Sequence, residues 1–436
     1  MNPEMLSAHT RRWRSVCFYI LYCSAPVSAV MLGGRTSLHA ENVFYHMVVP
    51  FLAQHDPVLV SSYPTGINQS GEVCGTFFVR GDLNLGEPPF LYTPFVYSDS
   101  VGIVELIDRR EGLQGFATGI NDRGQVAIFG GRVDGDVGVA YRFTPGVGLE
   151  TLDSVGKVGG DFTHGINNLG QVVGVSDLPD ALGSIGFFAA TPDNVIGLGS
   201  FDPQVSSSAR DINDSGQITG VSDGRAFIYT SELGMIPIGR GVGFAINKNG
   251  VVAGASDGAA LFKGGNTLEL GSFGGDSWAN DLNDYNVVVG AAYHSWFFPT
   301  ASSGFVWSEA TGLLNLNSFL PTGWSVGEAR GVNNRGQIVC QGYSDGTGET
   351  PEGAYVVRLD PIVPRLAVQS VNGKLKVSWS PAWPGLVLES TADLVTADWQ
   401  PVSTGGTNVI HRPFTAPSQF FRLNLESIRG LCCAPE

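Results

Sequence analysis

The sequence predicts an all-β protein: a seven-bladed β-propeller followed by a small C-terminal β-sandwich. The first observation behind this prediction is a hairpin motif that recurs seven times along the chain. The second is a composition of 59 glycines in 436 residues with 43% hydrophobic residues. Glycine spread through Val, Ile and Phe is typical of many short strands joined by tight turns. The third is the repeat length, which suits a unit of about four strands.

The repeated motif joins two strands through a tight turn, as in GINNLGQVVG from Gly165 and DINDSGQITG from Asp211. Asn at the first turn position and Gly three residues later favour a type I turn followed by a left-handed residue. In the sixth copy Asn takes the glycine position, and Asn is the next most tolerant residue for that conformation. The turn pairs are Asn68 and Gly71, Asn121 and Gly124, Asn167 and Gly170, Asn213 and Gly216, Asn247 and Gly250, Asn283 and Asn286, and Asn333 and Gly336.

The spacing of the turn asparagines, 34 to 53 residues, favours propeller blades over the alternative of a β-solenoid, whose coils are shorter and more uniform. We expect the propeller to span residues 44–358. Its last unit ends after a third strand near Val357, and an extra strand is predicted at Phe44–Phe51. If that strand completes the seventh blade, no sheet edge is left open.

The hairpin is followed by an Ala-Phe-x-Tyr/Trp segment, as within Asp211–Tyr229. This combination resembles the HAF repeat of bacterial extracellular proteins, over residues 44–358. The chain departs from that family because the eponymous His is absent, and Arg225 precedes Ala226 instead. The resemblance implies secretion and a repeat architecture, and it implies no defined chemistry.

The N-terminus predicts a secretory signal peptide at residues 1–29. A basic segment at Arg11–Arg14 precedes an apolar run from Val16 to Pro26, and small residues up to Ala29 fit a cleavage site, with a second candidate after Ala40. The apolar run is shorter than the roughly 20 residues of a membrane span. A buried N-terminal helix is the alternative. We expect a protein that is secreted or on the cell surface of a bacterium, with no transmembrane segment in the mature chain.

The C-terminal part is predicted as a linker at 359–365, a β-sandwich module at 366–425 and a tail at 426–436. Apolar and polar residues alternate in Lys374–Ser380, which indicates a half-buried strand. Its Trp-Ser-Pro, Leu-Glu-Ser, Trp and Phe-Phe-Arg-Leu segments, in that order, resemble C-terminal modules on secreted proteins of the Verrucomicrobia and their relatives. Sorting or attachment is one role that this resemblance allows.

Charge and motifs exclude several classes of function. With 25 Lys+Arg against 40 Asp+Glu, the net charge is −15, which opposes binding to nucleic acid. The sequence lacks G-x-S-x-G, H-E-x-x-H, a P-loop and zinc-ligand spacing, so we predict no cofactor and no metal. The segment from Asp211 to Gly216 matches the start of a calcium loop but lacks its later carboxylate, which favours a structural turn. Cys74 and Cys340 are predicted as buried free thiols that point to opposite faces of their strands.

Function is expected on the face opposite the tight turns, called here the long-loop face, because loops on rigid scaffolds carry binding sites. Its predicted loops are Gly81–Pro89, Lys157–His164, Leu178–Ser184, Ala291–Ser303 and Ser344–Gly353. The candidate ligand-binding residues form an aromatic run in one of them, with packing between blades as the alternative: Tyr293, His294, Trp296, Phe297 and Phe298.

These observations predict a secreted, non-catalytic repeat protein that acts as a binding scaffold for an extracellular glycan or protein. The first alternative is a polysaccharide-active hydrolase or lyase that uses carboxylates of the long-loop face, with Asp161, Asp276 and Glu328 as candidates. The second is a structural component of the envelope or matrix.

Overall fold

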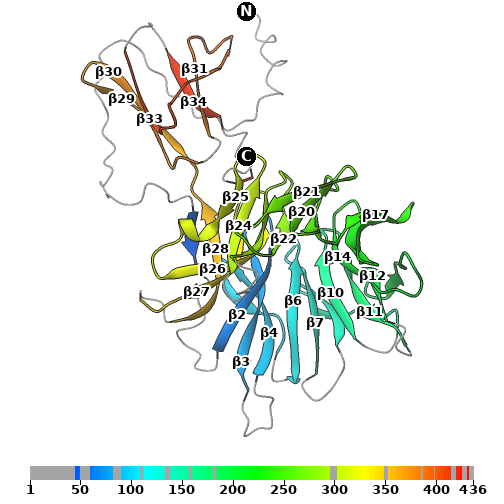
Figure 1. The fold of residues 1–436 in the computed structure, drawn as a ribbon. Coiled ribbons are helices and arrows are strands. Elements are labelled where there is room, and N and C mark those ends of the chain that lie inside the picture. The colour runs from blue at the N-terminus through cyan, green and yellow to red at the C-terminus, as the bar shows by residue number, and fades with distance from the viewer. Residues whose placement is uncertain are drawn as a thin grey trace, which may run out of the picture.

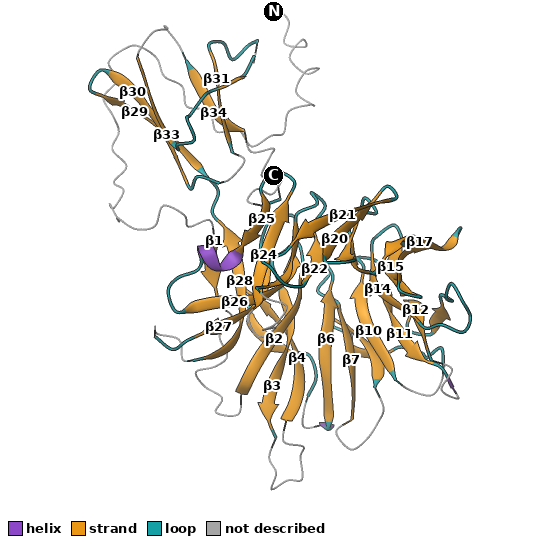
Figure 2. Ribbon diagram, in the orientation of Figure 1, coloured by secondary structure: helices purple, strands orange, loops and turns teal. Residues whose placement is uncertain are grey.

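The computed structural model describes residues 45–49, 59–81, 90–108, 111–132, 138–156, 160–179, 183–294, 302–347, 352–383, 386–396, 398–413, 419–424 and 430–431. These residues form an all-β structure in which strands dominate, and a short 3-10 helix, η5 (Leu316–Phe319), follows β25 (Figure 2). The predicted signal peptide lies outside the described residues. Within them, no helix has the length and apolar character needed to cross a membrane.

Seven four-stranded antiparallel sheets make up the first part of the described chain. The first strands are β2 (Leu59–Ile67), β6 (Leu113–Ile120), β10 (Asp161–Ile166), β14 (Ser207–Ile212), β18 (Val242–Ile246), β22 (Ser277–Leu282) and β26 (Trp324–Val332). The second strands are β3 (Val73–Arg80), β7 (Val126–Arg132), β11 (Val172–Asp177), β15 (Ile218–Ser222), β19 (Val252–Ala255), β23 (Val288–Tyr293) and β27 (Ile338–Ser344). The third strands are β4 (Phe90–Ser98), β8 (Val139–Thr144), β12 (Ser184–Thr191), β16 (Arg225–Thr230), β20 (Ala259–Lys263), β24 (Ser302–Ser308) and β28 (Gly353–Pro361). The outer strands are β5 (Gly102–Glu105), β9 (Gly148–Thr151), β13 (Asn194–Gly197), β17 (Gly234–Arg240), β21 (Asn266–Gly271), β25 (Gly312–Asn315) and, in the last sheet, β1 (Tyr45–Val48).

The sheets follow one another around a closed, propeller-like ring (Figure 1). Each first strand contacts the first strand of the next sheet, and β26 contacts β2. The last sheet is completed from the other end of the chain, because β1 pairs antiparallel with β28, with Tyr45 opposite Pro361. The strand expected at 44–51 therefore joins the first and last units, and its described part is Tyr45–Val48.

The side chains of the turn asparagines form a ring of hydrogen bonds at the ends of the first strands. Each turn Asn donates from Nδ2 to the backbone carbonyl oxygen of the turn Asn in the next sheet, over 2.8–3.1 Å. The series returns to its start, since Asn333 donates to the carbonyl oxygen of Asn68 at 2.9 Å. All seven asparagines are buried. The order of donors is Asn68, Asn121, Asn167, Asn213, Asn247, Asn283 and Asn333.

The same asparagines shape their own turns. In Asn121, Oδ1 accepts hydrogen bonds from the backbone N–H groups of Arg123 and Gln125, at 3.0 and 2.9 Å. The residue three positions after the asparagine has positive φ, at 71° in Gly124 and at 58° in Asn286, which is the left-handed conformation that the sequence predicts. One amide side chain therefore both closes a turn and ties it to its neighbour.

In six of the seven copies, the residue that follows the turn asparagine donates its backbone N–H to the side chain of the equivalent residue in the next sheet. The backbone N–H of Asp122 donates to Oδ1 of Asn168, and that of Asn168 donates to Oδ1 of Asp214, both at 2.8 Å. Asn334 closes the series by donating to Oε1 of Gln69 at 3.0 Å. The backbone N–H of Lys248 also donates to Oδ1 of Asp284, at 3.2 Å, and the Lys248 side chain forms an ion pair with the same carboxylate at 2.9 Å.

Arg358 of β28 joins the last sheet to the first. Its guanidinium, 3% exposed, donates to the carbonyl oxygen of Gly71 at 3.0 Å and forms ion pairs with Asp99 and Asp360. Arg142 does the same between two other sheets, where it donates to the carbonyl oxygen of Gly170 at 2.7 Å. In both places a guanidinium group links two sheets through charge-assisted hydrogen bonds.

Two aspartates near the ring brace neighbouring first strands. Asp211 accepts from the backbone N–H groups of Ile212 and Ile246, and Asp281 accepts from those of Leu282 and Val332, over 2.7–2.8 Å. Burial raises the pKa of both carboxyls to about 7 in spite of these hydrogen bonds. Both oxygens of Asp211 are therefore used within the protein, in keeping with the structural turn favoured over a calcium loop.

The C-terminal strands form two three-stranded sheets around a core of their own. The order is β29–β30–β33 in one sheet and β32–β31–β34 in the other. The strands are β29 (Arg365–Val371), β30 (Lys374–Ser380), β31 (Val387–Thr391), β32 (Gln400–Pro401), β33 (Val409–Pro413) and β34 (Phe420–Asn424). The linker expected at 359–365 is shorter in the structure, because β28 continues to Pro361 and β29 begins at Arg365.

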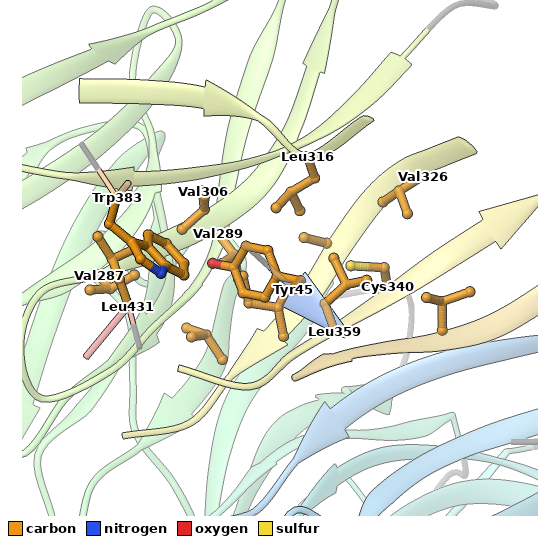
Figure 3. Close-up of a cluster of buried hydrophobic side chains, with 14 residues drawn as sticks. Tyr45, Val287, Val289, Val306, Leu316, Val326, Cys340, Leu359, Trp383 and Leu431 are labelled. Atoms are coloured by element: carbon orange, nitrogen blue, oxygen red, sulfur yellow. The ribbon is translucent and has the colours of Figure 1, made fainter. Parts of the chain in front are cut away.

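This C-terminal part is anchored to the tight-turn side of the ring (Figure 1). Trp383 and Leu431 enter a buried cluster with Tyr45 and Val287, in which the Tyr45 and Trp383 rings meet edge-on at 5.4 Å (Figure 3). The carbonyl oxygen of Gly430 accepts a hydrogen bond from Nδ2 of Asn283, at 3.0 Å. The chain's C-terminal segment thus contacts the asparagine ring itself.

The asparagine ring predicts a large effect of one substitution. Asn121→Ala removes two donors to neighbouring oxygens and two acceptors of turn N–H groups. Leaving such buried groups without partners should lower the free energy of unfolding by about 2–4 kcal/mol. Urea denaturation measures this loss. Asn194→Ala, at an exposed position of β13, is the matched control, and an equal effect of the two changes would contradict the role of the ring.

The buried aspartates predict a pH-dependent contribution to stability. A carboxyl whose pKa is raised on folding holds its proton more tightly in the folded chain, so its contribution falls as pH rises from about 4 to about 7. The stability difference between the wild type and Asp281→Asn should therefore shrink between pH 5 and pH 8, on the order of 2 kcal/mol. Comparing urea denaturation of the two proteins across this range cancels the titration of other groups. A difference that does not change with pH would show that Asp281 titrates normally.

Candidate functional site

Every first strand carries a β-bulge three residues before its turn asparagine. The register against the second strand shifts at this point in all seven described hairpins. A bulge leaves one residue out of the ladder and re-aims its side chain. The bulge residues are Thr65, Thr118, His164, Arg210, Phe244, Asn280 and Arg330.

These seven bulge residues converge on one pocket along the axis of the ring, called here the axial pocket. Together with Trp278 they line a volume of about 460 Å³. That volume falls in the range of small-molecule sites, about 300–1,000 Å³. The fold therefore brings together side chains that lie up to 265 residues apart in the sequence, from Thr65 to Arg330.

One side of the axial pocket is electrostatically complete. Arg330 forms an ion pair with Oε2 of Glu328 at 2.7 Å, and Nδ2 of Asn280 donates to Oε1 of Glu328 at 2.9 Å. The hydroxyl of Tyr63 donates to Oε2 of Glu328 at 3.4 Å, and the Arg330 guanidinium lies over the Tyr63 ring at 4.7 Å. Both oxygens of this predicted candidate carboxylate are therefore engaged within the protein.

The opposite side of the axial pocket contains an arginine, Arg210, that has no acidic partner in the described part of the chain. Among the described residues no carboxylate pairs with Arg210, and its buried Nε has no hydrogen-bond partner. Burial lowers the pKa of Arg210 and lowers that of His164 to about 3, with the charge of Arg210 as a second cause. His164 is thus a neutral imidazole beside a guanidinium. Both residues point into a common space, since both line the axial pocket.

A second pocket, called here the side pocket, opens from this side between β10 and β14. It has a volume of about 320 Å³ and shares His164 and Arg210 with the axial pocket. Hydroxyl groups line it as well, and the buried Oγ of Ser208 has no partner there. Its remaining lining residues are Phe162, Val175, Ser184, Ser206, Ser207 and Val221.

A row of aromatic rings, called here the aromatic strip, leads to the side pocket across the first three sheets. Its members are Phe78, Tyr92, Phe116, Phe129 and Phe162. Successive ring centroids lie 4.2–6.0 Å apart. All five are partly exposed, and Phe162, at the pocket, is 38% exposed. Each lies toward the strand end remote from the tight turns, so the strip belongs to the long-loop face.

The structure places two of the five predicted ligand-binding residues. Tyr293 meets the pocket-lining Trp278 edge-on at 5.2 Å. His294 stacks on Phe273 at 5.6 Å, and its Nε2 hydrogen-bonds to Oγ of Ser303 at 2.7 Å. Trp296, Phe297 and Phe298 lie outside the described residues. Of the aromatic run, Tyr293 therefore contacts a residue that lines the axial pocket.

Other predicted residues have structural surroundings. Asp161 accepts from the hydroxyl of Ser154 at 3.1 Å, and the carbonyl oxygen of Asp276 accepts from the N–H of Tyr293 at 2.8 Å. His164, expected at the end of a loop, lies inside strand β10 because that strand begins at Asp161. Cys74 and Cys340 are buried free thiols in separate clusters, which confirms that prediction, and burial raises the pKa of Cys74 to about 12.

The bulge residues were missed by the sequence reasoning, although the repeats contain a signal for them. The position three before the asparagine holds Thr, Thr, His, Arg, Phe, Asn and Arg in the seven copies. The position before it is small or compact in every copy, and the residue next to the asparagine is Ile, Leu or Val. A position that is variable and largely polar within an otherwise regular motif indicates a side chain that does not pack in the core.

Comparison with known proteins leaves the chain without an assigned family. Neither a scan against protein-family models nor a search of curated proteins finds a match. Among solved structures the chain is similar to apo prolyl oligopeptidase B from Galerina marginata, with 8% identity and a TM-score of 0.29. That likeness covers 83% of this chain and 52% of the other, so the chain spans about half the length of that structure.

Proposed function

We propose that this protein is a secreted, non-catalytic binding scaffold for an extracellular glycan. Its ring is a seven-bladed β-propeller of HAF-type repeats, its C-terminal part is a small β-sandwich, and its binding surface is the long-loop face. The observation that carries the proposal is the aromatic strip that ends at a pocket lined with hydroxyl groups and an arginine. Sugar rings offer apolar faces to aromatic side chains and hydroxyl groups to polar ones, and this arrangement supplies both.

The two ends of the ring support a division of roles. The C-terminal part is anchored beside the tight turns, through Trp383, Leu431 and the hydrogen bond to Gly430. The aromatic strip and the side pocket lie toward the opposite ends of the strands. Attachment through the C-terminal part would therefore leave the long-loop face open to a ligand.

The surroundings of Glu328 favour binding over hydrolysis. A glycosidase needs a carboxyl group that exchanges a proton with the substrate. The oxygens of Glu328 are held by Arg330, Asn280 and Tyr63. Burial raises the pKa of Glu328 to about 7, but because both oxygens are held by these three side chains, we propose that it stabilises the pocket wall and assign it no catalytic role.

The proposal predicts glycan binding that depends on Phe162. On a glycan and polysaccharide array the purified protein should bind without releasing products, as followed by mass spectrometry. Phe162→Ala should weaken that binding at least tenfold, because truncating a contact aromatic costs about 2 kcal/mol. Leu268→Ala, at an exposed position of the outer strand β21, should leave binding unchanged.

Three results would overturn this function. Released oligosaccharides would establish the hydrolase or lyase alternative. Binding that survives in Phe162→Ala would remove the aromatic strip from the site. Absence of glycan binding would reject a glycan ligand and turn the search to protein partners or a structural role.

A further inference from the structure

The side pocket contains a cation and a hydroxyl group that could bind an anion. Arg210 has no acid partner among the described residues, and its Nε is buried without a hydrogen bond. On the same strand, the buried Oγ of Ser208 also lacks a partner. Buried polar groups are normally satisfied, so unsatisfied ones mark the place of a missing partner. Here two of them line one pocket.

Two other arginines of the ring serve as a contrast. Arg330 is paired with Glu328 at 2.7 Å, and Arg358 is paired with both Asp99 and Asp360. Each of these two cations has an acidic partner within the protein, although Nε of Arg330 is also buried without a hydrogen bond to any described residue. Arg210 is different, because its neighbour Asp211 directs both oxygens to the backbone N–H groups of Ile212 and Ile246. An anion from outside can therefore supply what Arg210 lacks.

The surroundings of Arg210 select the kind of anion. A planar guanidinium matches a carboxylate with two parallel hydrogen bonds. His164 is neutral, and the rest of the side pocket consists of serines, valines and Phe162. A single cation suits the single charge of a carboxylate, whereas a phosphate carries up to two charges and is commonly held by several cations. The volume of about 320 Å³ has room for a sugar ring.

We propose that the side pocket binds the carboxylate of an acidic sugar, with Arg210 as its anchor. The inference rests on the proposed glycan-binding function and specifies its ligand as a saccharide that carries a carboxylate on the pyranose ring. Arg210 receives the carboxylate, Ser208 and His164 offer further hydrogen bonds, and Phe162 contacts the face of the sugar. The neighbouring sugars extend along the aromatic strip. The net charge of −15 repels anions at long range, so recognition depends on this one buried cation.

The test uses a matched pair of ligands, a uronic acid oligosaccharide and the same oligosaccharide with its carboxylates reduced to alcohols. Isothermal titration calorimetry should show at least tenfold weaker binding of the reduced ligand to the wild type. Arg210→Gln should lose that preference and bind both ligands with similar, weaker affinity. Arg210→Lys should restore part of the preference, because it keeps the charge without the paired geometry.

Arg225→Gln is the matched control, since Arg225 is an exposed arginine of the same sheet paired with Asp223. It should keep both the affinity and the preference of the wild type. Thermal unfolding of each variant verifies that the ring is intact. Equal binding of the two ligands by the wild type, or an unchanged preference in Arg210→Gln, would overturn the carboxylate site while leaving glycan binding in place. Failure of both ligands to bind would overturn the carboxylate site, and the glycan array would then decide whether the proposed glycan-binding function is overturned as well.

Discussion

The hydrogen bond from each turn asparagine to the next is the interaction on which the ring depends. The first strand of each sheet is an edge strand with free backbone groups, and side chains from the neighbouring sheet bond to them, as when Nδ2 of Asn121 donates to the carbonyl oxygen of Asn167. The asparagine amide has an acceptor that closes its own turn and a donor that reaches the neighbouring turn. Because Asn333 donates to Asn68, the series has no free end. The pairing of β1 with β28 and the contacts of Arg358 close the same junction farther from the axis.

This arrangement also makes room for a binding site. The asparagines hold the first strands close around the axis, and the bulge above each asparagine turns one side chain toward the space between them. Packing between sheets is carried by the neighbouring positions, so the bulge residue is free to vary. Thr, His, Arg, Phe and Asn can therefore occupy equivalent positions without disturbing the ring. The bulge is repeated in every sheet, and because its residue differs from sheet to sheet, the lining of the axial pocket is irregular.

The arginines of the ring differ in whether they have an acidic partner within the described part of the protein. Arg142, Arg330 and Arg358 each have an acidic partner, and the aspartates at the first strands face backbone N–H groups. Arg210 lies outside this pattern, next to a neutral histidine and at the end of the aromatic strip. This difference from the other arginines is why we propose Arg210 as the anchor of a ligand.

The sequence by itself determined the repeating unit, because the asparagine and glycine positions follow from local turn chemistry and the strands from their apolar pattern. It also predicted the strand at 44–51 as the partner of the last unit, and the structure pairs Tyr45–Val48 with β28. It missed β29 and β33, where exposed and polar residues such as Gln369, His411 and Arg412 hide the alternation. The axial pocket was decided only by tertiary structure. Its seven bulge residues come one from each sheet, and their separation in the chain gives no local sign that His164, Arg210 and Arg330 meet around one axis.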